Sequence, residues 1–273
     1  MWLAYTFKRQ TVTDLAGAWQ LSQRQIRREL KIPTNIIVKP KHIPDPVVIV
    51  LDTTYFGSYG VMVFRASREK RNLLWYFVSQ ETNVDYLRGL EELKRSGYTI
   101  AAVVCDGKRW LCEQISGLYP VQHCQFHMMK IVTKYLTRHP EWQAGRELRS
   151  LSLTLSRTTE DIFRNNLKDW KARWVDFLSE RSVDPLTGHW HYTHRRIRGA
   201  FMAIKHALPY LFTHQRFPAL KIPNTTNSLD GSFSQLKQKI HVHCGLNIVT
   251  QKKMIGTILV GLKKKQKPTR NVH

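Results

Sequence analysis

Acidic residues are scarce in this sequence. The 273 residues contain 20 Asp and Glu against 43 Lys and Arg, which gives a formal net charge of +23. Such an excess of positive charge indicates a polyanionic partner, and nucleic acid is the leading one. The basic residues are spread along the chain and are not confined to one amphipathic helix, so an anionic membrane surface is the weaker alternative.

Cysteines and long hydrophobic runs are also scarce. Four cysteines in a chain of this length do not make a disulfide framework, which favours a reducing cytoplasm. There is no apolar run of about 18 residues, so no membrane-spanning helix is expected. The first residues lack the layout of a signal peptide. We therefore expect a cytoplasmic protein with a substantial core, more than one structural unit and no membrane partner.

The N-terminal residues 1–33 predict two short helices. Thr11 or Thr13 is expected to cap the first, residues 17–20 to form the turn, and Ser22 to cap the second. The exposed face of the second helix would carry Arg24, Arg27 and Arg28. This pattern resembles a helix-turn-helix, whose second helix enters the DNA major groove, and an ordinary helical hairpin is the alternative.

Four prolines lie close together after this region, at positions 33, 40, 44 and 46. Their spacing excludes a helix and predicts a linker over residues 34–46. Beyond it, period-2 and period-3.6 patterns alternate. Strands are predicted at 47–52, 59–64, 73–79, 99–105 and 121–126, and helices at 84–96 and 108–118. The fold class is therefore α/β with a mixed sheet, and this order of elements resembles a ribonuclease H-like fold.

Strand character is then lost, and an all-helical insertion is predicted at about 128–220. Its helices are expected at 128–135, 147–155, 160–178 and 195–211. Aromatic residues recur in it at Trp142, Trp170, Trp174, Phe177, Trp190 and Tyr192. Most of them are expected to form a helical core, whereas one or two would be available to stack on unpaired bases.

A further helix is predicted at 224–240. Leu229, Phe233, Leu236 and Ile240 form an apolar stripe along it, and Asp230 and Lys237 lie on a neighbouring face. Gly231 is a poor helix former, which suggests a close approach by another backbone or a ligand. The basic tail, 263–273, is expected to contact phosphates.

Three aspartates in this positively charged chain suggest a site for divalent cations. Asp52 and Asp106 each close an apolar strand, where a carboxylate is costly unless it is paired. Adjacent strands of an open α/β sheet bring such residues together at their carboxyl ends. With Asp230 as a third member, they predict a cage for divalent cations on a surface that binds a polyanion. Such a cage suits phosphodiester chemistry.

Four sequence pieces together resemble one known family. They are Leu51–Gly57 (LDTTYFG), Val104–Gly107 (VCDG), Cys124–His127 (CQFH) and Thr226–Asp230 (TNSLD). The combination resembles the DDE transposases of the Mutator-like superfamily, including bacterial insertion-sequence transposases, over residues 47 to about 250. The resemblance implies a ribonuclease H-like catalytic domain, here residues 47–262, with a helical insertion between the second and third acids.

The resemblance also implies roles for individual residues. Asp52, Asp106 and Asp230 would be catalytic and would hold two Mg²⁺ or Mn²⁺ ions. Cys124 and His127 match a Cys-x-x-His element of the family. The chain departs from the family at Asp230, where glutamate is usual. The only other acid from residue 181 onward is Asp184, which lacks the Thr-Asn lead-in.

A structural zinc is not expected, because Cys124 and His127 supply two ligands where four are needed. His241, His243 and Cys244 would have to complete the site. Packing or hydrogen bonding is therefore the preferred role for Cys124 and His127.

These expectations describe an insertion-sequence transposase that cleaves and transfers DNA strands. Its partners would be double-stranded DNA, both the terminal inverted repeats of the element and the target, and further copies of itself. Its location would be the bacterial cytoplasm, at the nucleoid. Arg24, Arg27, Arg28 and Lys237 would contact DNA. The alternatives are a decayed or repurposed transposase that only binds DNA, and a ribonuclease H-like nuclease of repair or resolution.

Overall fold

The computed structural model describes residues 1–8, 10–31, 46–108, 110–243 and 245–261. The contacts divide the chain into two compact units, His42–Leu229 and the pair of segments Met1–Lys41 and Asp230–His273. The predicted basic tail and, apart from residue 46, the predicted linker lie outside the described residues. No helix within the described ranges is long and apolar enough to cross a bilayer.

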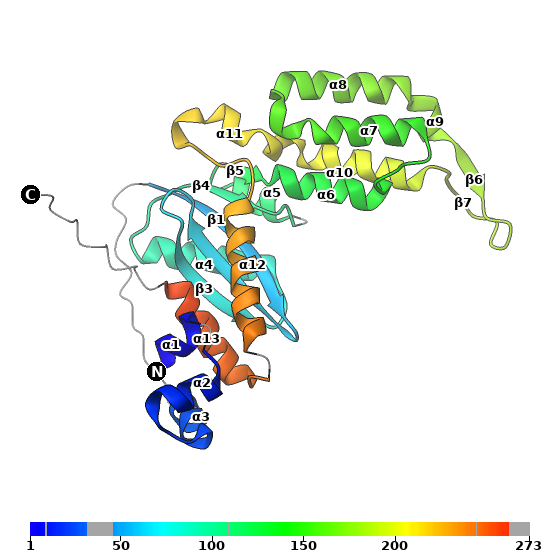
Figure 1. Ribbon diagram of the computed structural model, residues 1–273. Helices are drawn as coiled ribbons and strands as arrows, with labels where there is room; N and C mark the ends of the chain where they lie inside the picture. Colours follow the sequence, from blue (N-terminus) through cyan, green and yellow to red (C-terminus); the bar gives the residue numbers. More distant parts are fainter. Residues whose placement is uncertain (9, 32–45, 109, 244, 262–273) are drawn as a thin grey trace, which may run out of the picture. The chain divides into compact units, whose positions relative to one another are not determined.

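A five-stranded mixed sheet forms the centre of the unit His42–Leu229 (Figure 1). The strands are β1 Val47–Phe56, β2 Tyr59–Ala66, β3 Arg71–Val78, β4 Ile100–Cys105 and β5 Val121–His123, in the order β3-β2-β1-β4-β5. β1 is antiparallel to β2 and parallel to β4, and β4 is parallel to β5. The predicted α/β class with a mixed sheet is confirmed.

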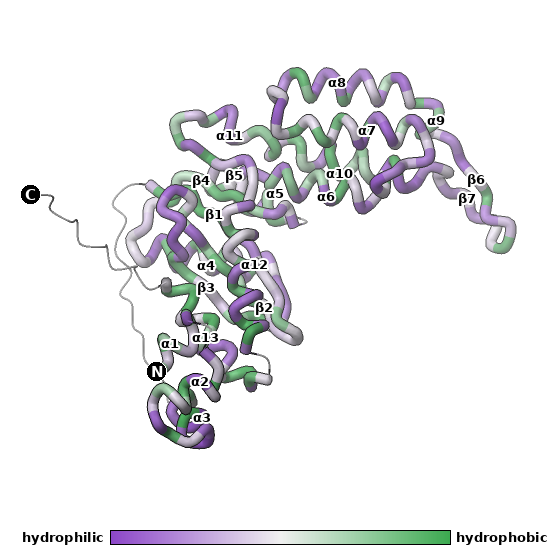
Figure 2. The backbone as a smooth tube through the Cα atoms, in the orientation of Figure 1, coloured by the Kyte–Doolittle hydropathy of each residue, from purple (hydrophilic) through white to green (hydrophobic). Residues whose placement is uncertain are grey.

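The strands form because their apolar runs can be buried on both faces. In β1 the residues from Ile49 to Leu51 are completely buried, and β4 is buried from Ala102 to Cys105. Both strands lie among the hydrophobic stretches of Figure 2. Such continuous apolar runs are typical of strands in the interior of a sheet.

Two helices complete this core, α4 Asn83–Arg95 and α5 Leu111–Ser116. The hydroxyl of Thr82 accepts a hydrogen bond from the backbone N–H of Asp85 at 3.1 Å, which caps α4. Tyr86, Leu90 and Leu93 of α4 are buried in the same apolar cluster as Phe64 of β2. These are the positions that period 3.6 places on one face of the helix.

The helical part of the insertion surrounds a second apolar core. It consists of α6 Gln125–Leu136, α7 Gln143–Leu153, α8 Glu160–Arg173, α9 Val175–Ser179, α10 Arg195–Leu211 and α11 Thr213–Arg216, with single 3-10 turns at Leu155–Arg157 and Pro218–Leu220. α6 packs against both α7 and α10 (Figure 1). Trp170 is buried in this core, and its indole N–H donates to the carbonyl of Ala144 at 3.0 Å.

Two predictions for this region were wrong. The insertion is not all-helical, because β6 Arg181–Val183 and β7 Trp190–Tyr192 pair as an antiparallel hairpin. Its turn closes through the Asp184 carboxylate, which accepts the backbone N–H groups of Leu186 and Thr187. The strand predicted at 121–126 ends at His123, and Gln125 already begins α6.

The other unit is helical among its described residues. It contains α1 Trp2–Phe7, α2 Val12–Trp19, α3 Gln23–Lys31 and α13 Ile248–Val260, together with α12 Asn227–Val242 from Asp230 onward. The Trp2 indole N–H donates to the Thr257 hydroxyl at 3.0 Å, which joins α1 to α13. The sequence predicted neither α1 nor α13.

The predicted helix pair near the N-terminus is present, with its turn displaced. Thr11 and Asp14 form a reciprocal capping box at the start of α2, and the Ser22 hydroxyl accepts the Gln25 N–H at 3.2 Å at the start of α3. Residues 17–19 belong to α2 and not to the turn, because the left-handed residue that ends the helix is Gln20, with φ of 50°.

Candidate functional site

Asp52 and Asp106 occupy equivalent positions on neighbouring parallel strands. Val50 of β1 pairs with Val104 of β4, and each aspartate lies two residues further along its strand direction. Because side chains alternate along extended strands, Asp52 projects from the same face as Val50, and Asp106 follows directly after β4 at the same level of the sheet. The two acids predicted from the sequence are therefore neighbours in the fold.

Both carboxylates are partly withdrawn from solvent. Asp52 is buried, with 8% of its surface exposed, and one of its oxygens accepts the backbone N–H of Thr53 at 2.7 Å. Asp106 is half-buried and accepts the backbone N–H of Lys108 at 3.2 Å. These bonds orient the two carboxylates. Carboxylate oxygens are hard donors that fit a divalent cation.

A polar network missed by the sequence reasoning lies beside Asp52. The hydroxyl of Thr53 bonds with the Tyr86 hydroxyl at 2.8 Å, which in turn donates to the Glu81 carboxylate at 2.7 Å. Lys108 donates to the Glu81 carbonyl and lies 4.0 Å from its carboxylate. Burial, followed by the charge of Glu81, raises the pKa of Tyr86, so that this phenol stays a proton donor. The network ties α4 to the middle of β1 through Thr53 and to the turn after β4 through Lys108.

Gly107 is required directly after Asp106 for two reasons. Its φ is +80°, a left-handed conformation that L side chains rarely adopt. A Cβ at this position would lie 1.7 Å from Nε2 of His123. His123 is itself buried, and burial lowers its pKa to about 4, so the ring is neutral at pH 7. The sequence motif contained Gly107, whereas only the fold reveals its partner on β5.

An open cavity of about 610 Å³ adjoins this turn. Gly107, Lys108 and Trp110 line one part of it, and Tyr135, His206 and Tyr210 are among the residues that line the remainder. Trp110 is 57% exposed and has φ of +66°. A bulky residue in the left-handed region is an outlier of the kind that is enriched at functional sites.

Cys124, His127 and Thr226 form a second cluster, which we call the thiol clamp. The Cys124 sulfur accepts hydrogen bonds from the backbone N–H and the hydroxyl of Thr226, at 3.3 and 3.4 Å. Nδ1 of His127 lies 3.3 Å from the same hydroxyl. Burial alone raises the pKa of Cys124, but the hydrogen bonds from His127 and Thr226 outweigh it and lower the pKa. Cys124 and His127 thus belong to one hydrogen-bonded cluster with Thr226.

A pair of amide contacts extends the thiol clamp. The backbone N–H of Gln125 donates to the Asn224 carbonyl, and the Asn224 side chain donates to that of Gln125, both at 3.0 Å. The segment before α12 is therefore fastened to the first turn of α6. Two motifs that are about 100 residues apart in the sequence become one structural element.

The remaining predicted residues lie in the other unit. Asp230 is half-buried in the first turn of α12, and the division between the units falls directly before it. Lys237 is exposed on the same helix, and Arg24, Arg27 and Arg28 are exposed on α3, where Ile26 and Leu30 are buried. A Cβ on Gly231 would meet no atom of the described residues within 4 Å, so no neighbouring group among them explains this glycine.

The cysteines and histidines considered for zinc are only partly described. Cys244 lies outside the described residues, and the His243 ring packs on Tyr5 at 4.1 Å between centroids. Cys105 and Cys112 are free thiols 3.4 Å apart in the sheet core. Within the part of the chain that the structure describes, no three His, Cys, Asp or Glu side chains form a group suited to a metal ion.

Comparisons with known proteins add no family assignment. No family model matches the chain, and no curated protein matches it. The reasons for a functional assignment therefore lie in the residues and their geometry.

Proposed function

We propose that this protein is a DNA transposase of an insertion sequence, which cleaves DNA strands and transfers them in a metal-dependent reaction. The observation that carries the proposal is the parallel register of β1 with β4, in which Val50 pairs with Val104 and Asp52 and Asp106 each follow two residues later. A hairpin of β2 and β3 beside β1, followed by parallel β4 and β5, is the arrangement expected of a ribonuclease H-like fold. The proposal therefore includes that fold.

Asp52, Asp106 and Asp230 are proposed to hold two Mg²⁺ or Mn²⁺ ions. Such ions, when bound, activate a water or a 3′-hydroxyl and stabilise the leaving oxygen at phosphorus. Asp52 and Asp106 contribute carboxylate oxygens that their backbone hydrogen bonds hold in place. Asp230 lies in the first turn of a 16-residue helix, where acidic side chains interact favourably with the helix dipole.

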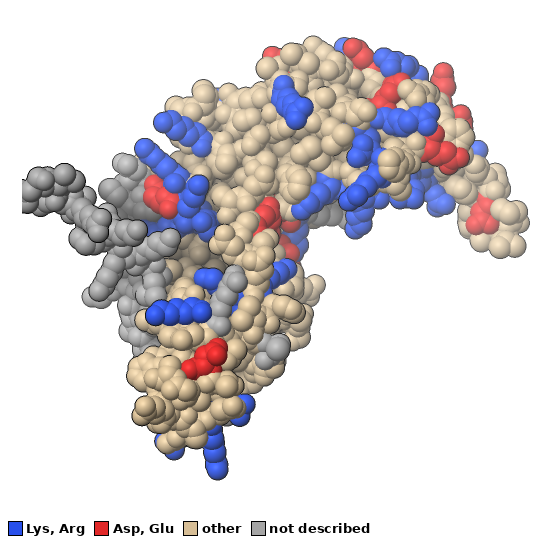
Figure 3. Space-filling view, viewed as in Figure 1, with Lys and Arg blue, Asp and Glu red and all other residues tan. Residues whose placement is uncertain are grey.

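The basic surface supports DNA as the substrate. Lys and Arg side chains are distributed over the face drawn in Figure 3 and are not confined to one element. The pair α2 and α3 is proposed to act as a helix-turn-helix, with Arg24, Arg27 and Arg28 towards the groove and Lys237 available for a phosphate. We further propose that the protein self-associates, binds two element ends and is located at the nucleoid.

Strand cleavage on the flanking genomic DNA tests this function. The wild-type protein is expected to cut and join element ends with Mg²⁺ or Mn²⁺. Asp52→Asn, Asp106→Asn or Asp230→Asn should lower the rate by about 1000-fold or more, because each removes a charged ligand worth several kcal/mol in the transition state. Asp169→Asn, at an exposed position of α8, is the matched control.

The variants also distinguish the alternatives. Full activity of Asp230→Asn would remove Asp230 from the site, and Asp230→Glu is expected to remain active because it retains the carboxylate. Specific DNA binding without cleavage by the wild type would instead assign a DNA-binding role without catalysis. Cleavage that depends on the structure of the DNA, without any strand transfer, would identify the protein as a nuclease.

A further inference from the structure

The structure separates the tryptophans of the insertion into two groups. Trp170 is 3% exposed, and Trp174 is half-buried with its indole N–H bonded to Glu147 at 3.0 Å. These two support the helical core. Trp190, in contrast, is 55% exposed on β7 of the hairpin, so its ring is not needed to fill a core. A large part of this ring is therefore accessible to a ligand.

Arginines hold the hairpin aromatics in a fixed arrangement. The Arg181 guanidinium lies 4.1 Å from the Trp190 ring centroid and 5.6 Å from that of Tyr192. Arg198, on α10, lies 3.5 Å from the Tyr192 ring centroid and donates to the Leu178 carbonyl at 2.6 Å. We call Trp190, Arg181, Tyr192 and Arg198 the hairpin ladder. Its inner end is anchored in the insertion, and its outer end is the exposed ring of Trp190.

Strand register places the ladder on one side of the hairpin. Arg181 pairs with Tyr192 across the strands, and Trp190 lies two residues from Tyr192, so all three side chains project from the same face. On the other face, the hydroxyls of Ser182 and Thr193 bond to each other at 2.7 Å. The hairpin therefore has one polar face and one face of alternating rings and guanidinium groups.

The charges near the ladder suit a phosphate backbone. Residues 180–198 include four arginines against two acids, Glu180 and Asp184. Glu180 is already engaged with His194 at 2.8 Å, and Asp184 is used in the hairpin turn. The excess positive charge is thus available beside the exposed ring.

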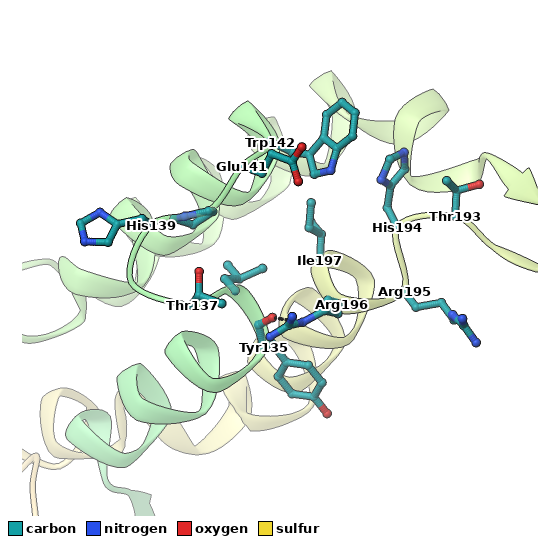
Figure 4. Close-up of a pocket in the computed structure, with 12 residues that line it drawn as sticks. Tyr135, Thr137, His139, Glu141, Trp142, Thr193, His194, Arg195, Arg196 and Ile197 are labelled. Carbon is teal, nitrogen blue, oxygen red and sulfur yellow. Dashed lines mark hydrogen bonds between the residues drawn. The ribbon is translucent and has the colours of Figure 1, made fainter.

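A pocket of about 500 Å³ opens where β7 leads into α10. Figure 4 shows Trp142 and His194 along one side of it, with Tyr135, Thr137 and Arg196 across from them. Arg196 donates to the Tyr135 carbonyl at 2.7 Å. Trp142 is 51% exposed, so a second exposed indole and further arginines follow directly after the ladder.

We infer that the hairpin ladder is a binding surface for unpaired bases of single-stranded nucleic acid, with Trp190 as the stacking platform. An exposed ring held by arginines on a basic segment is the combination that binds single strands, because every base offers a π-face and every linkage a negative charge. A duplex keeps its bases stacked and offers only phosphates to this surface. The inference requires no metal and does not rest on the proposed strand transfer.

Equilibrium binding in the presence of EDTA tests it. The full chain is titrated into a labelled thymidine strand of about 20 nucleotides and, separately, a duplex of the same length at one fixed salt concentration, with fluorescence anisotropy as the readout. Trp190→Ala should weaken binding of the single strand about 5- to 150-fold, since stacking contributes about 1–3 kcal/mol per base. Binding of the duplex should change by less than about twofold.

Two further variants control for the chemistry of the change. Trp190→Phe keeps an aromatic face and should restore most of the single-strand affinity. Leu186→Ala removes apolar surface from the same hairpin, where Leu186 is 94% exposed, and should bind like the wild type. Circular dichroism melting of each variant checks that it is folded.

Three outcomes would overturn the inference. Trp190→Ala could bind the single strand as tightly as the wild type. It could instead lose single strand and duplex equally, which would assign the effect to charge or folding. A change in the oligomeric state of Trp190→Ala on size exclusion, with unchanged single-strand binding, would make the ladder a contact between protein copies.

Discussion

The region around Asp52 and Asp106, on β1 and directly after β4, and the β6–β7 hairpin are both built on β-strands, but they differ in how far their side chains are buried. At the first, Asp52 and His123 are buried and the turn at Gly107 tolerates no added atom. At the second, Val183 and Trp190 are 64% and 55% exposed. Around Asp52 and Asp106, burial means that the choice of residues is limited by the need to fold. On the hairpin, the exposed residues are not limited in this way and can be selected for binding.

The largest expected difference between the two regions concerns their glycines. Gly107 and Gly188 both have positive φ, +80° and +69°, but a Cβ would meet neighbouring atoms within 4 Å at Gly107 and none at Gly188. Gly107→Ala should lower the free energy of unfolding by about 2–5 kcal/mol, from backbone strain and overpacking together. Gly188→Ala should lower it by about 1 kcal/mol, from backbone strain alone. Urea denaturation of both variants measures the difference, and equal losses would contradict the comparison.

The second-largest expected effect is a loss of stability at acidic pH, caused by His123. The pKa of His123 is lowered by burial to about 4, whereas the unfolded chain takes up the proton near pH 6.5. Between these values the unfolded state binds more protons, so stability is lost as the pH falls from 6.5 towards 4. The loss should be about 2 kcal/mol at about pH 5. Denaturation at neutral pH and at this acidic pH measures it, and His123→Gln should reduce the difference between the two values. An unchanged difference would mean that other groups carry it.

The smallest expected effect compares two hydroxyl groups. Thr226→Val removes the hydroxyl that Cys124 and His127 share in the thiol clamp, and it should cost about 1–2 kcal/mol because buried partners lose a hydrogen bond. Thr193→Val removes an exposed hydroxyl that bonds to Ser182 on the hairpin, and it should change stability by less than about 0.5 kcal/mol. Thermal unfolding compares them. A larger loss for Thr193→Val would reverse the assignment of the two regions.

The limits of helices and strands were predicted best where buried residues also recur with the period of the element. The limits of α10 are those expected from its apolar pattern, and the five strands of the sheet start within two residues of their predicted positions. The same rule found Asp52 and Asp106, because a charge directly after an apolar run is conspicuous in a sequence. The prediction that Asp52 closes its strand was wrong, because pairing with β2 continues β1 to Phe56. Their register needed the pairing of β1 with β4.

Long-range contacts explain what the sequence missed. From the sequence, Tyr86 cannot be distinguished from the other buried residues of α4. Its hydrogen bonds to Thr53 and Glu81, which only the structure shows, place it beside Asp52. The hairpin is too short for a clear period of 2, and its stability comes from the Asp184 turn and the arginine contacts. α1 has six residues, too few for a periodic pattern, and depends on α13 near the other end of the chain.

The thiol clamp should couple the evolution of positions 124 and 226. A sulfur acceptor at position 124 and a hydroxyl donor at position 226 are separated by 102 residues, but they satisfy each other inside the protein. Replacing either one alone leaves a buried polar group unsatisfied, whereas a paired replacement can preserve the contact. The two positions should therefore be inherited as a correlated pair, with substitutions at one accompanied by substitutions at the other.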